Sequence, residues 1–292
     1  MSIIEKAAKR LGQEHKDVVP RAHIEPQLRE VASAPVSAPE ERPEQVADNH
    51  PRLSPKQEIN LAQLHRLGMV TPNGGRTLVS EEFRFIKRPL IKNALHNPAS
   101  GNHGNLIMVT SSLPGEGKTF CAINLAMSIA MEMDHTVLLV DADAARPSVL
   151  QTLGLHADAG LMDVLIDGTL DIADVMVKTN VEALSVLPAG KNHKHATELL
   201  ASQNMSNLLD QIARRYPDRI IIFDSPPLLL TSEARVLASQ MGQIVVVVEA
   251  EKTTQNALKD ALRKISACPN VSLVYNKSRG FADGENYSSY YG

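Results

Sequence analysis

From residue 105 onward, short apolar runs alternate with segments whose apolar residues recur at helical spacing. The runs are rich in Val, Ile and Leu and cover residues 106–110, 136–140, 184–188, 219–224, 243–249 and 271–276. Near-continuous apolar runs are typical of parallel strands that are buried on both faces. The alternation predicts an α/β fold, a mostly parallel sheet with helices on both faces. The expected helices cover residues 120–133, 196–215, 234–241 and 254–266.

A glycine-rich loop follows the first apolar run directly. It reads Ser-Leu-Pro-Gly-Glu-Gly-Lys-Thr over residues 112–119, which is the Walker A spacing with Ser112 where the usual pattern has its first glycine. Gly115 and Gly117 allow backbone N–H groups to turn towards an anion, and the next helix presents its positive N-terminus there. Because the loop lies between a strand and a helix, it predicts a phosphate site in a sheet of the P-loop NTPase type.

Two side chains of this loop suit a nucleotide that is bound with magnesium. Lys118 can reach the β- and γ-phosphates of ATP, and the Thr119 hydroxyl can ligate Mg²⁺. The predicted nucleotide-binding residues of the loop are Pro114, Gly115, Glu116, Gly117, Lys118, Thr119 and Phe120.

Aspartates follow two of the later apolar runs. Asp141 and Asp143 come at the end of the second run, and Asp224 ends the fourth. The carboxyl ends of parallel strands form one edge of the sheet, which is where open α/β sheets bind their ligands. Carboxylates there can hold Mg²⁺ directly or through water. The predicted metal ligands are therefore Thr119, Asp141 and Asp224, and the predicted cofactors are ATP and Mg²⁺.

The region before the sheet divides into three expected segments. Residues 1–12 have helical apolar spacing and predict an amphipathic N-terminal helix. Residues 13–55 contain seven prolines in a polar stretch that cannot bury enough apolar surface to offset its ordering entropy, so we expect a disordered linker. Residues 56–100 predict a helical lead-in, with one helix ending near Gly68 and another from about 80 to 93.

Charge and cysteine content exclude several classes of protein. The formal net charge is −3, from 30 basic and 33 acidic residues, which excludes binding to nucleic acid through bulk electrostatics. The two cysteines cannot build a disulfide framework, and no apolar run approaches the ~18 residues that span a bilayer. We therefore expect a cytoplasmic protein without a nucleic-acid partner.

The tyrosines are concentrated at one end of the chain. Tyr287, Tyr290 and Tyr291 are three of the five tyrosines and lie in the last six residues. Aromatic side chains usually serve as buried bulk, so a cluster on a terminus indicates another use. We expect a domain over 101–280 followed by a flexible, tyrosine-rich tail over 281–292.

The loop at 112–119, the Asp141-Ala-Asp143 segment and Asp224-Ser-Pro-Pro together resemble the bacterial tyrosine kinases. The resemblance covers roughly residues 80–292. It implies a catalytic set of Lys118, Asp141 and Asp143, with Asp141 acting on Mg²⁺ and on the attacking hydroxyl and Asp143 assisting. It also implies that Asp224 holds Mg²⁺ through water and that Asn276 contacts adenine.

Further segments match this family in part. Glu81, Arg84 and Lys87 are similar to a Glu-x-x-Arg-x-x-Arg segment with which these kinases pack subunits into a ring, although Lys87 replaces an arginine and loses its bidentate geometry. Ala145 stands where the second acidic motif usually has arginine, with Arg146 one position later. The related partition ATPases carry a signature lysine where this chain has Leu113.

The resemblance implies an ATP-dependent tyrosine autokinase that phosphorylates its own tail tyrosines, Tyr287, Tyr290 and Tyr291, in trans. The opening residues are similar to soluble kinases linked to exosortase and exopolysaccharide loci, which implies a role in exopolysaccharide synthesis or export. The implied partners are a homo-oligomeric ring, a membrane chain-length or co-polymerase protein that places the kinase at the inner membrane, and a tyrosine phosphatase. Two alternatives remain open: a deviant-Walker ATPase, and a nucleotide-gated scaffold without essential phosphorylation.

Overall fold

The computed structural model describes residues 56–96, 103–216 and 218–278 of the chain. The expected N-terminal helix at 1–12, the Pro-rich segment at 13–55 and the tyrosine-rich tail at 281–292 lie outside the described residues. Within the described ranges, no helix combines the length and the apolar content needed to cross a membrane.

A seven-stranded sheet forms the centre of the described structure, with strand order β3-β4-β2-β5-β1-β6-β7. All neighbouring pairs are parallel except β3 with β4, so the predicted mostly parallel sheet is confirmed. The strands are β1 Leu106–Ser111, β2 Thr136–Asp141, β3 Val177–Lys178, β4 Leu184–Leu187, β5 Arg219–Asp224, β6 Gln243–Glu249 and β7 Val271–Asn276. The antiparallel β3 was not predicted, because two residues are too few to give an apolar pattern.

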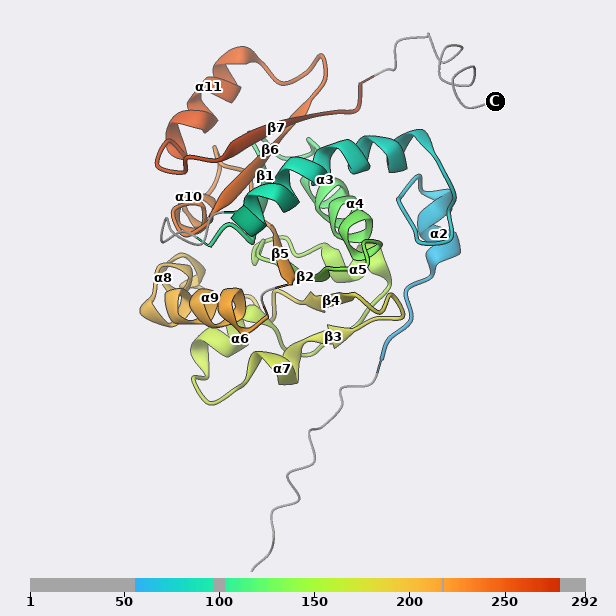
Figure 1. Cartoon of the computed structure of the whole chain (residues 1–292). Coiled ribbons are helices and arrows are strands. Elements are labelled where there is room, and N and C mark those ends of the chain that lie inside the picture. Colours follow the sequence, from blue (N-terminus) through green and yellow to red (C-terminus); the bar gives the residue numbers. More distant parts are fainter. Residues whose placement is uncertain (1–55, 97–102, 217, 279–292) are drawn as a thin grey trace, which may run out of the picture. The chain divides into compact units, whose positions relative to one another are not determined.

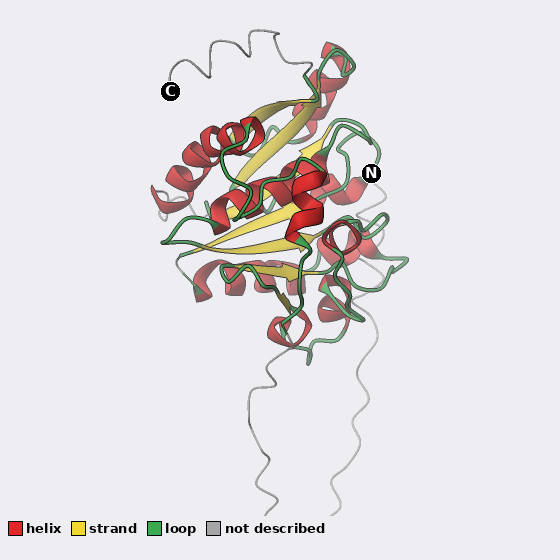
Figure 2. Ribbon diagram, turned by 90° about the vertical axis from the view of Figure 1, so that its right-hand side faces the viewer, coloured by secondary structure: helices red, strands yellow, loops and turns green. Residues whose placement is uncertain are grey.

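Helices cover both faces of this sheet, as Figure 2 shows. The described helices are α2 Leu61–Arg66, α3 Leu78–His96, α4 Lys118–Ala130, α5 Val149–Leu153, α6 Leu161–Ile166, α7 Ile172–Val175, α8 Ala196–Leu200, α9 Gln203–Arg215, α10 Ser232–Ala238 and α11 Gln255–Lys264. The single helix predicted over 196–215 is wrong. Ser202 accepts the backbone N–H of Met205 at 3.2 Å and begins α9 as a new helix.

The alternation of side chains along β1 divides the core into two layers. Figure 1 labels β1 and the helices of both layers. Leu106 and Met108 pack into one cluster with α6, α8, α9 and α10. Ile107 and Val109 pack into the other with α2, α3 and α4. Because β1 is buried on both faces, its carboxyl end is held rigidly between the layers, and the glycine-rich loop begins there.

The last strand departs from the expectation that every apolar run is buried on both faces. Leu273 and Tyr275 of β7 are 53% and 64% exposed. β7 lies at the edge of the sheet and pairs with β6 alone. An edge strand has one neighbour instead of two, so fewer side chains cover it.

The lead-in segment packs into the same core as the sheet. Phe83 and Leu90 of α3 are buried among residues of α4 and the strands. Lys87, on the same side of α3, is 4% exposed, donates to the Ser128 carbonyl at 2.6 Å and lies 2.5 Å from Glu132. Its ammonium therefore binds the last turn of α4, where carbonyl groups lack helical partners.

We expect Lys87→Ala to lower the free energy of unfolding by about 2 kcal/mol, because it removes a buried charge-assisted hydrogen bond and the packing of the aliphatic stem. Lys87→Met keeps the stem and should lose about 1 kcal/mol. Urea unfolding of both variants measures the difference. Equal losses would show that the packing of the aliphatic stem contributes nothing beyond the hydrogen bond, and an unchanged stability of Lys87→Met would show that the hydrogen bond to Ser128 contributes nothing.

The pH dependence of this contact follows from Glu132. The hydrogen bond from Lys87 holds the pKa of Glu132 below its ordinary value of 4.5. A carboxyl whose pKa is lowered by folding stabilises the protein above that ordinary value, and the contribution is lost as the pH falls through the folded pKa. The stability difference between wild type and Glu132→Gln should therefore shrink in acid.

Candidate active site

The loop between β1 and α4 has the backbone that an anion site requires. Gly115 and Gly117 have φ of 84° and 98°, a region that L side chains rarely adopt. A Cβ on Gly117 would lie 2.1 Å from Nδ2 of Asn276. Glycine is therefore needed at 117 both for its φ and for the close approach of the end of β7.

Two side chains at the end of β7 hold the carbonyl groups of this loop. Asn276 Nδ2 donates to the Glu116 carbonyl at 2.8 Å, and Lys277 Nζ donates to the Gly115 carbonyl at 2.6 Å. In a trans peptide unit the carbonyl and the following N–H point in opposite directions. The N–H groups of Glu116 and Gly117 are thus directed away from β7, as an anion-cradling loop requires.

The predicted lysine and the predicted acids meet at one edge of the sheet. Lys118 Nζ lies 2.9 Å from Asp143 Oδ2 and 4.0 Å from Asp224 Oδ1. Thr119 donates its hydroxyl to Asp224 Oδ2 at 2.6 Å. Asp141 and Asp224 are direct partners in the parallel register of β2 and β5. Residues at the ends of three different strands thus form one charged cluster.

The position of Asp224 disfavours the charged form of its carboxyl group. It is fully buried, and burial raises the pKa of its carboxyl to about 7, although Lys118 and Thr119 act in the opposite direction. Its Oδ1 finds no hydrogen-bond donor within the described part of the chain. A buried anionic oxygen without a donor suits a hydrated divalent cation, so Asp224, with the Thr119 hydroxyl beside it, suits the expected Mg²⁺.

Asp141 is bound chiefly by backbone groups. Its Oδ2 accepts the N–H groups of Ser148 and Val149 at 2.9 and 3.0 Å, and its Oδ1 accepts the N–H of Asp143 at 3.3 Å. Burial nevertheless raises the pKa of the Asp141 carboxyl. Ser148, whose hydroxyl lies 3.1 Å from that of Thr119, was not predicted, because nothing in its local sequence distinguishes it.

After Asp143, this chain has Ala145 at the position where the family pattern has arginine, and Arg146 follows. Ala145 and Arg146 are both exposed. Arg146 contributes its backbone N–H to Asp143 Oδ1 at 3.1 Å. The main chain of Arg146 therefore orients Asp143.

The other predicted site residues belong to the phosphate loop, to the start of α4 and to the tail of the chain. Phe120 packs against the core in the first turn of α4, whereas Pro114 is exposed on the loop. Tyr287, Tyr290 and Tyr291 lie outside the described residues.

The segment predicted to pack subunits together is only partly available at the surface. Glu81 and Arg84 form an ion pair of 2.6 Å and are 40% and 35% exposed. Lys87 faces α4 inside the same chain, since position 87 lies on the buried side of α3. Its ammonium group is bound by Ser128 and Glu132 of its own chain.

No group of three or more His, Cys, Asp or Glu side chains arranged as a metal cage occurs in the ranges that the structure describes. Nucleotide sites do not need one, because Mg²⁺ there is bound by one or two carboxylates together with phosphates.

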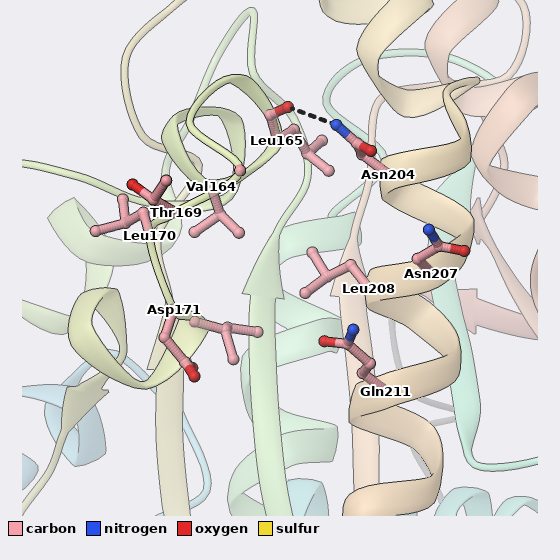
Figure 3. Close-up of a pocket in the computed structure, with 11 residues that line it drawn as sticks. Val164, Leu165, Thr169, Leu170, Asp171, Asn204, Asn207, Leu208 and Gln211 are labelled. Carbon is pink, nitrogen blue, oxygen red and sulfur yellow. Dashed lines mark hydrogen bonds between the residues drawn. The ribbon is translucent and has the colours of Figure 1, made fainter. Parts of the chain in front are cut away.

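A surface pocket of about 320 Å³ lies apart from this site, between α6, the following loop and α9 (Figure 3). Asn204, Asn207 and Gln211 of α9 face it, and Asn204 Nδ2 donates to the Leu165 carbonyl at 3.5 Å. Its described lining contains no Lys or Arg, so it lacks the cations that bind phosphates. The edge at Lys118 is the candidate active site on chemical grounds.

Comparisons with known proteins agree with this geometry. The family model described as an AAA domain matches residues 104–274, which include Lys118, Asp141, Asp143 and Asp224. The tyrosine-protein kinase ptk of Acinetobacter johnsonii is 32% identical over 174 residues, 60% of this chain and 23% of that protein. The chain thus spans under a quarter of that relative's length.

Other relatives are covered over most of their length. The tyrosine-protein kinase YwqD of Bacillus subtilis is 30% identical over 198 residues, 68% of this chain and 80% of that protein. The crystal structure of the chimerical protein CapA2B2 is 26% identical, with a TM-score of 0.59 over 73% of this chain and 97% of that one.

Proposed function

Because the chain belongs to the AAA-domain family and to the bacterial tyrosine-protein kinases, we propose that it transfers the γ-phosphoryl group of ATP to tyrosine at the Lys118 site. One observation carries the proposal. Lys118 and Thr119 of the phosphate loop meet Asp143 and Asp224 from two other strands, at 2.9 and 2.6 Å. That arrangement supplies the cation, the hydroxyl and the carboxylates that phosphoryl transfer from a metal-bound nucleotide requires.

Phosphoryl transfer depends on positioning and charge neutralisation more than on covalent chemistry. Lys118 moves from the Asp143 carboxylate to the β- and γ-phosphates, where the N–H groups of the loop also bind. Thr119, Asp141 and Asp224 are the residues that would hold Mg²⁺. When bound, this ion neutralises charge on the phosphate oxygens.

The attacking group is a tyrosine phenol, whose unperturbed pKa is about 10. We assign Asp141 to orient and deprotonate it, with Asp143 assisting. Burial raises the pKa of Asp141, which makes this carboxylate a stronger base than one in water. The backbone N–H groups that bind both its oxygens fix its orientation.

We propose that the acceptors are Tyr287, Tyr290 and Tyr291 of a neighbouring copy. Each phosphate adds about −1.5 to −2 charges, so several on one tail repel acidic neighbours and release it. Glu81 and Arg84 are the residues of the proposed ring contact. The resemblance extends the proposal to regulation of exopolysaccharide synthesis or export, with a membrane chain-length or co-polymerase protein and a tyrosine phosphatase as partners.

A mixing experiment with γ-labelled ATP and Mg²⁺ tests this function. The donor is a Tyr287/Tyr290/Tyr291→Phe triple variant, which keeps its site but lacks acceptors. The recipient is Lys118→Met with an intact tail and a size tag. We expect label on tyrosine of the tagged recipient in the mixture, and none when either variant is incubated alone.

Two outcomes would oppose the proposal. Phosphate released into solution without labelled tyrosine would favour the ATPase or scaffold alternatives. Label on wild type that is absent from the mixture would exclude transfer in trans while leaving the kinase activity intact.

A further inference from the structure

Glu116 places a carboxylate inside a loop that is built to bind phosphates. An acid there would repel the nucleotide if it faced the anion site. The side chain is instead almost completely buried, at 3% exposure. A buried carboxylate requires hydrogen-bond donors, and these donors show which way it points.

Both oxygens of Glu116 are used within the protein. Oε2 accepts the Leu113 N–H at 2.7 Å, which closes the loop upon itself. Oε1 accepts the hydroxyl of Thr253, in the turn that follows β6. The same hydroxyl accepts the Glu249 N–H at 3.0 Å, so the loop is connected to the backbone at the end of β6.

The topology separates this contact from the reacting groups. In the sheet, β5 and β2 lie on one side of β1, and β6 lies on the other side. The Lys118 side chain points to Asp143, which follows β2, and to Asp224, which ends β5. Thr253, in contrast, follows β6. Glu116 and Lys118 thus leave the loop in opposite directions. The carboxylate is therefore hydrogen-bonded away from the anion site, and it anchors the loop.

The turn at 249–253 holds the loop at a second point. Glu249 lies 3.4 Å from Lys277, which donates to the Gly115 carbonyl at 2.6 Å. Glu251 and Lys277 are the non-glycine residues of the described chain with positive φ, at 59° and 57°. Such a conformation costs free energy and persists where the surroundings impose it.

We propose that Thr253 is a positioning residue of the nucleotide site. It holds Glu116, and through it the phosphate loop, in the form that binds phosphates before nucleotide arrives. Preorganised N–H groups bind an anion without the cost of ordering the loop. The inference rests on the proposed function, because it needs the loop to bind nucleotide.

Fluorescent ADP with Mg²⁺ measures the effect directly. We expect Thr253→Val, which keeps the shape and removes the hydroxyl, to weaken binding about tenfold, since a hydrogen bond to a charged group is lost and a buried oxygen is left unpaired. Thr253→Ser restores the hydroxyl and should bind within about twofold of wild type. Affinity at wild-type level in Thr253→Val would overturn the proposal, as would failure of serine to restore it.

The neighbouring threonine offers a matched control. Thr254 begins α11, and its hydroxyl accepts the Ala257 N–H at 3.2 Å. Thr254→Val should lower the thermal midpoint while nucleotide affinity stays unchanged. An equal loss of affinity in Thr254→Val would assign the effect to general destabilisation and contradict the role of Thr253.

A double-mutant cycle tests whether Thr253 acts through Glu116. If it does, Glu116→Ala with Thr253→Val binds no more weakly than Glu116→Ala alone. If the fold-losses in nucleotide affinity of the two single variants multiply in the double variant, Thr253 does not act through Glu116. The two proposals also fail separately, because absence of binding by wild type contradicts the nucleotide site, whereas equal binding by wild type and Thr253→Val contradicts only the positioning role.

Discussion

Lys118→Met is expected to reduce labelled phosphate on tyrosine by about 10²- to 10³-fold, the usual loss when one preorganised donor to a developing charge is removed. Lys118 is the cation that links the loop to the acids, 2.9 Å from Asp143 and 4.0 Å from Asp224. Methionine has a similar length and fills a similar volume, so the change removes mainly the charge. Quantified label from γ-labelled ATP measures the loss.

The change also alters the site before nucleotide arrives. Lys118 is the group that most strongly opposes the raised pKa of Asp224. Without it, the pKa of Asp224 should rise further, and fewer copies carry the carboxylate that Mg²⁺ needs at neutral pH. Mg²⁺-dependent nucleotide binding should therefore weaken together with transfer.

Lys259→Met provides the comparison, because Lys259 is an exposed lysine on α11. It should retain wild-type labelling. Label in Lys118→Met within about twofold of this control would mean that charge neutralisation at the loop does not limit the reaction.

The parts of the site that could be predicted are those whose geometry is local or follows from strand direction. Gly115, Gly117 and Lys118 form a contiguous motif, and its backbone follows from glycine φ and the start of α4. Asp141 and Asp224 lie far apart in sequence, but each ends an apolar parallel strand. Since such strands end at one edge, their proximity follows from the fold class alone.

Contacts between distant turns could not be predicted in this way. Thr253 reaches Glu116 across 137 positions, and no apolar period marks a turn residue as a partner of the loop. The burial of Lys87 depends on how α3 is rotated against α4, which its charge pattern alone did not reveal. The break before α9 was missed although Ser202 is a typical N-cap residue, because the apolar spacing continues through it.

Asp224→Asn is expected to make the nucleotide-free protein more stable at alkaline pH while it abolishes transfer. Folding raises the pKa of Asp224 from 3.8 to about 7. A carboxyl with a raised pKa stabilises the fold fully below its unfolded pKa, and the contribution is lost as the pH rises through the folded value. Above about pH 7 the wild type therefore keeps a buried charge at a cost that asparagine avoids.

The expected gain is on the order of 2–4 kcal/mol at about pH 8, with the lower end set by the need to pair the new amide group. The gain should shrink as the pH falls from 7 towards 4, since both proteins then carry a neutral group at this position. Urea unfolding of the two proteins over this range measures it. Asp218→Asn, just before the other end of β5, is the matched control, because its side chain is only partly buried, and it should not reproduce the gain.

A less stable Asp224→Asn protein at alkaline pH would show that the carboxylate is well paired without nucleotide, contrary to its donor-free Oδ1. The expected result has a different meaning. If Asp224→Asn gains stability and loses activity, the Asp224 carboxylate destabilises the nucleotide-free fold but is needed for the reaction. A bound cation then compensates the charge of this carboxylate. Adding Mg²⁺ and ADP should then stabilise wild type and leave Asp224→Asn nearly unchanged, since only the form that binds ligand gains free energy from it.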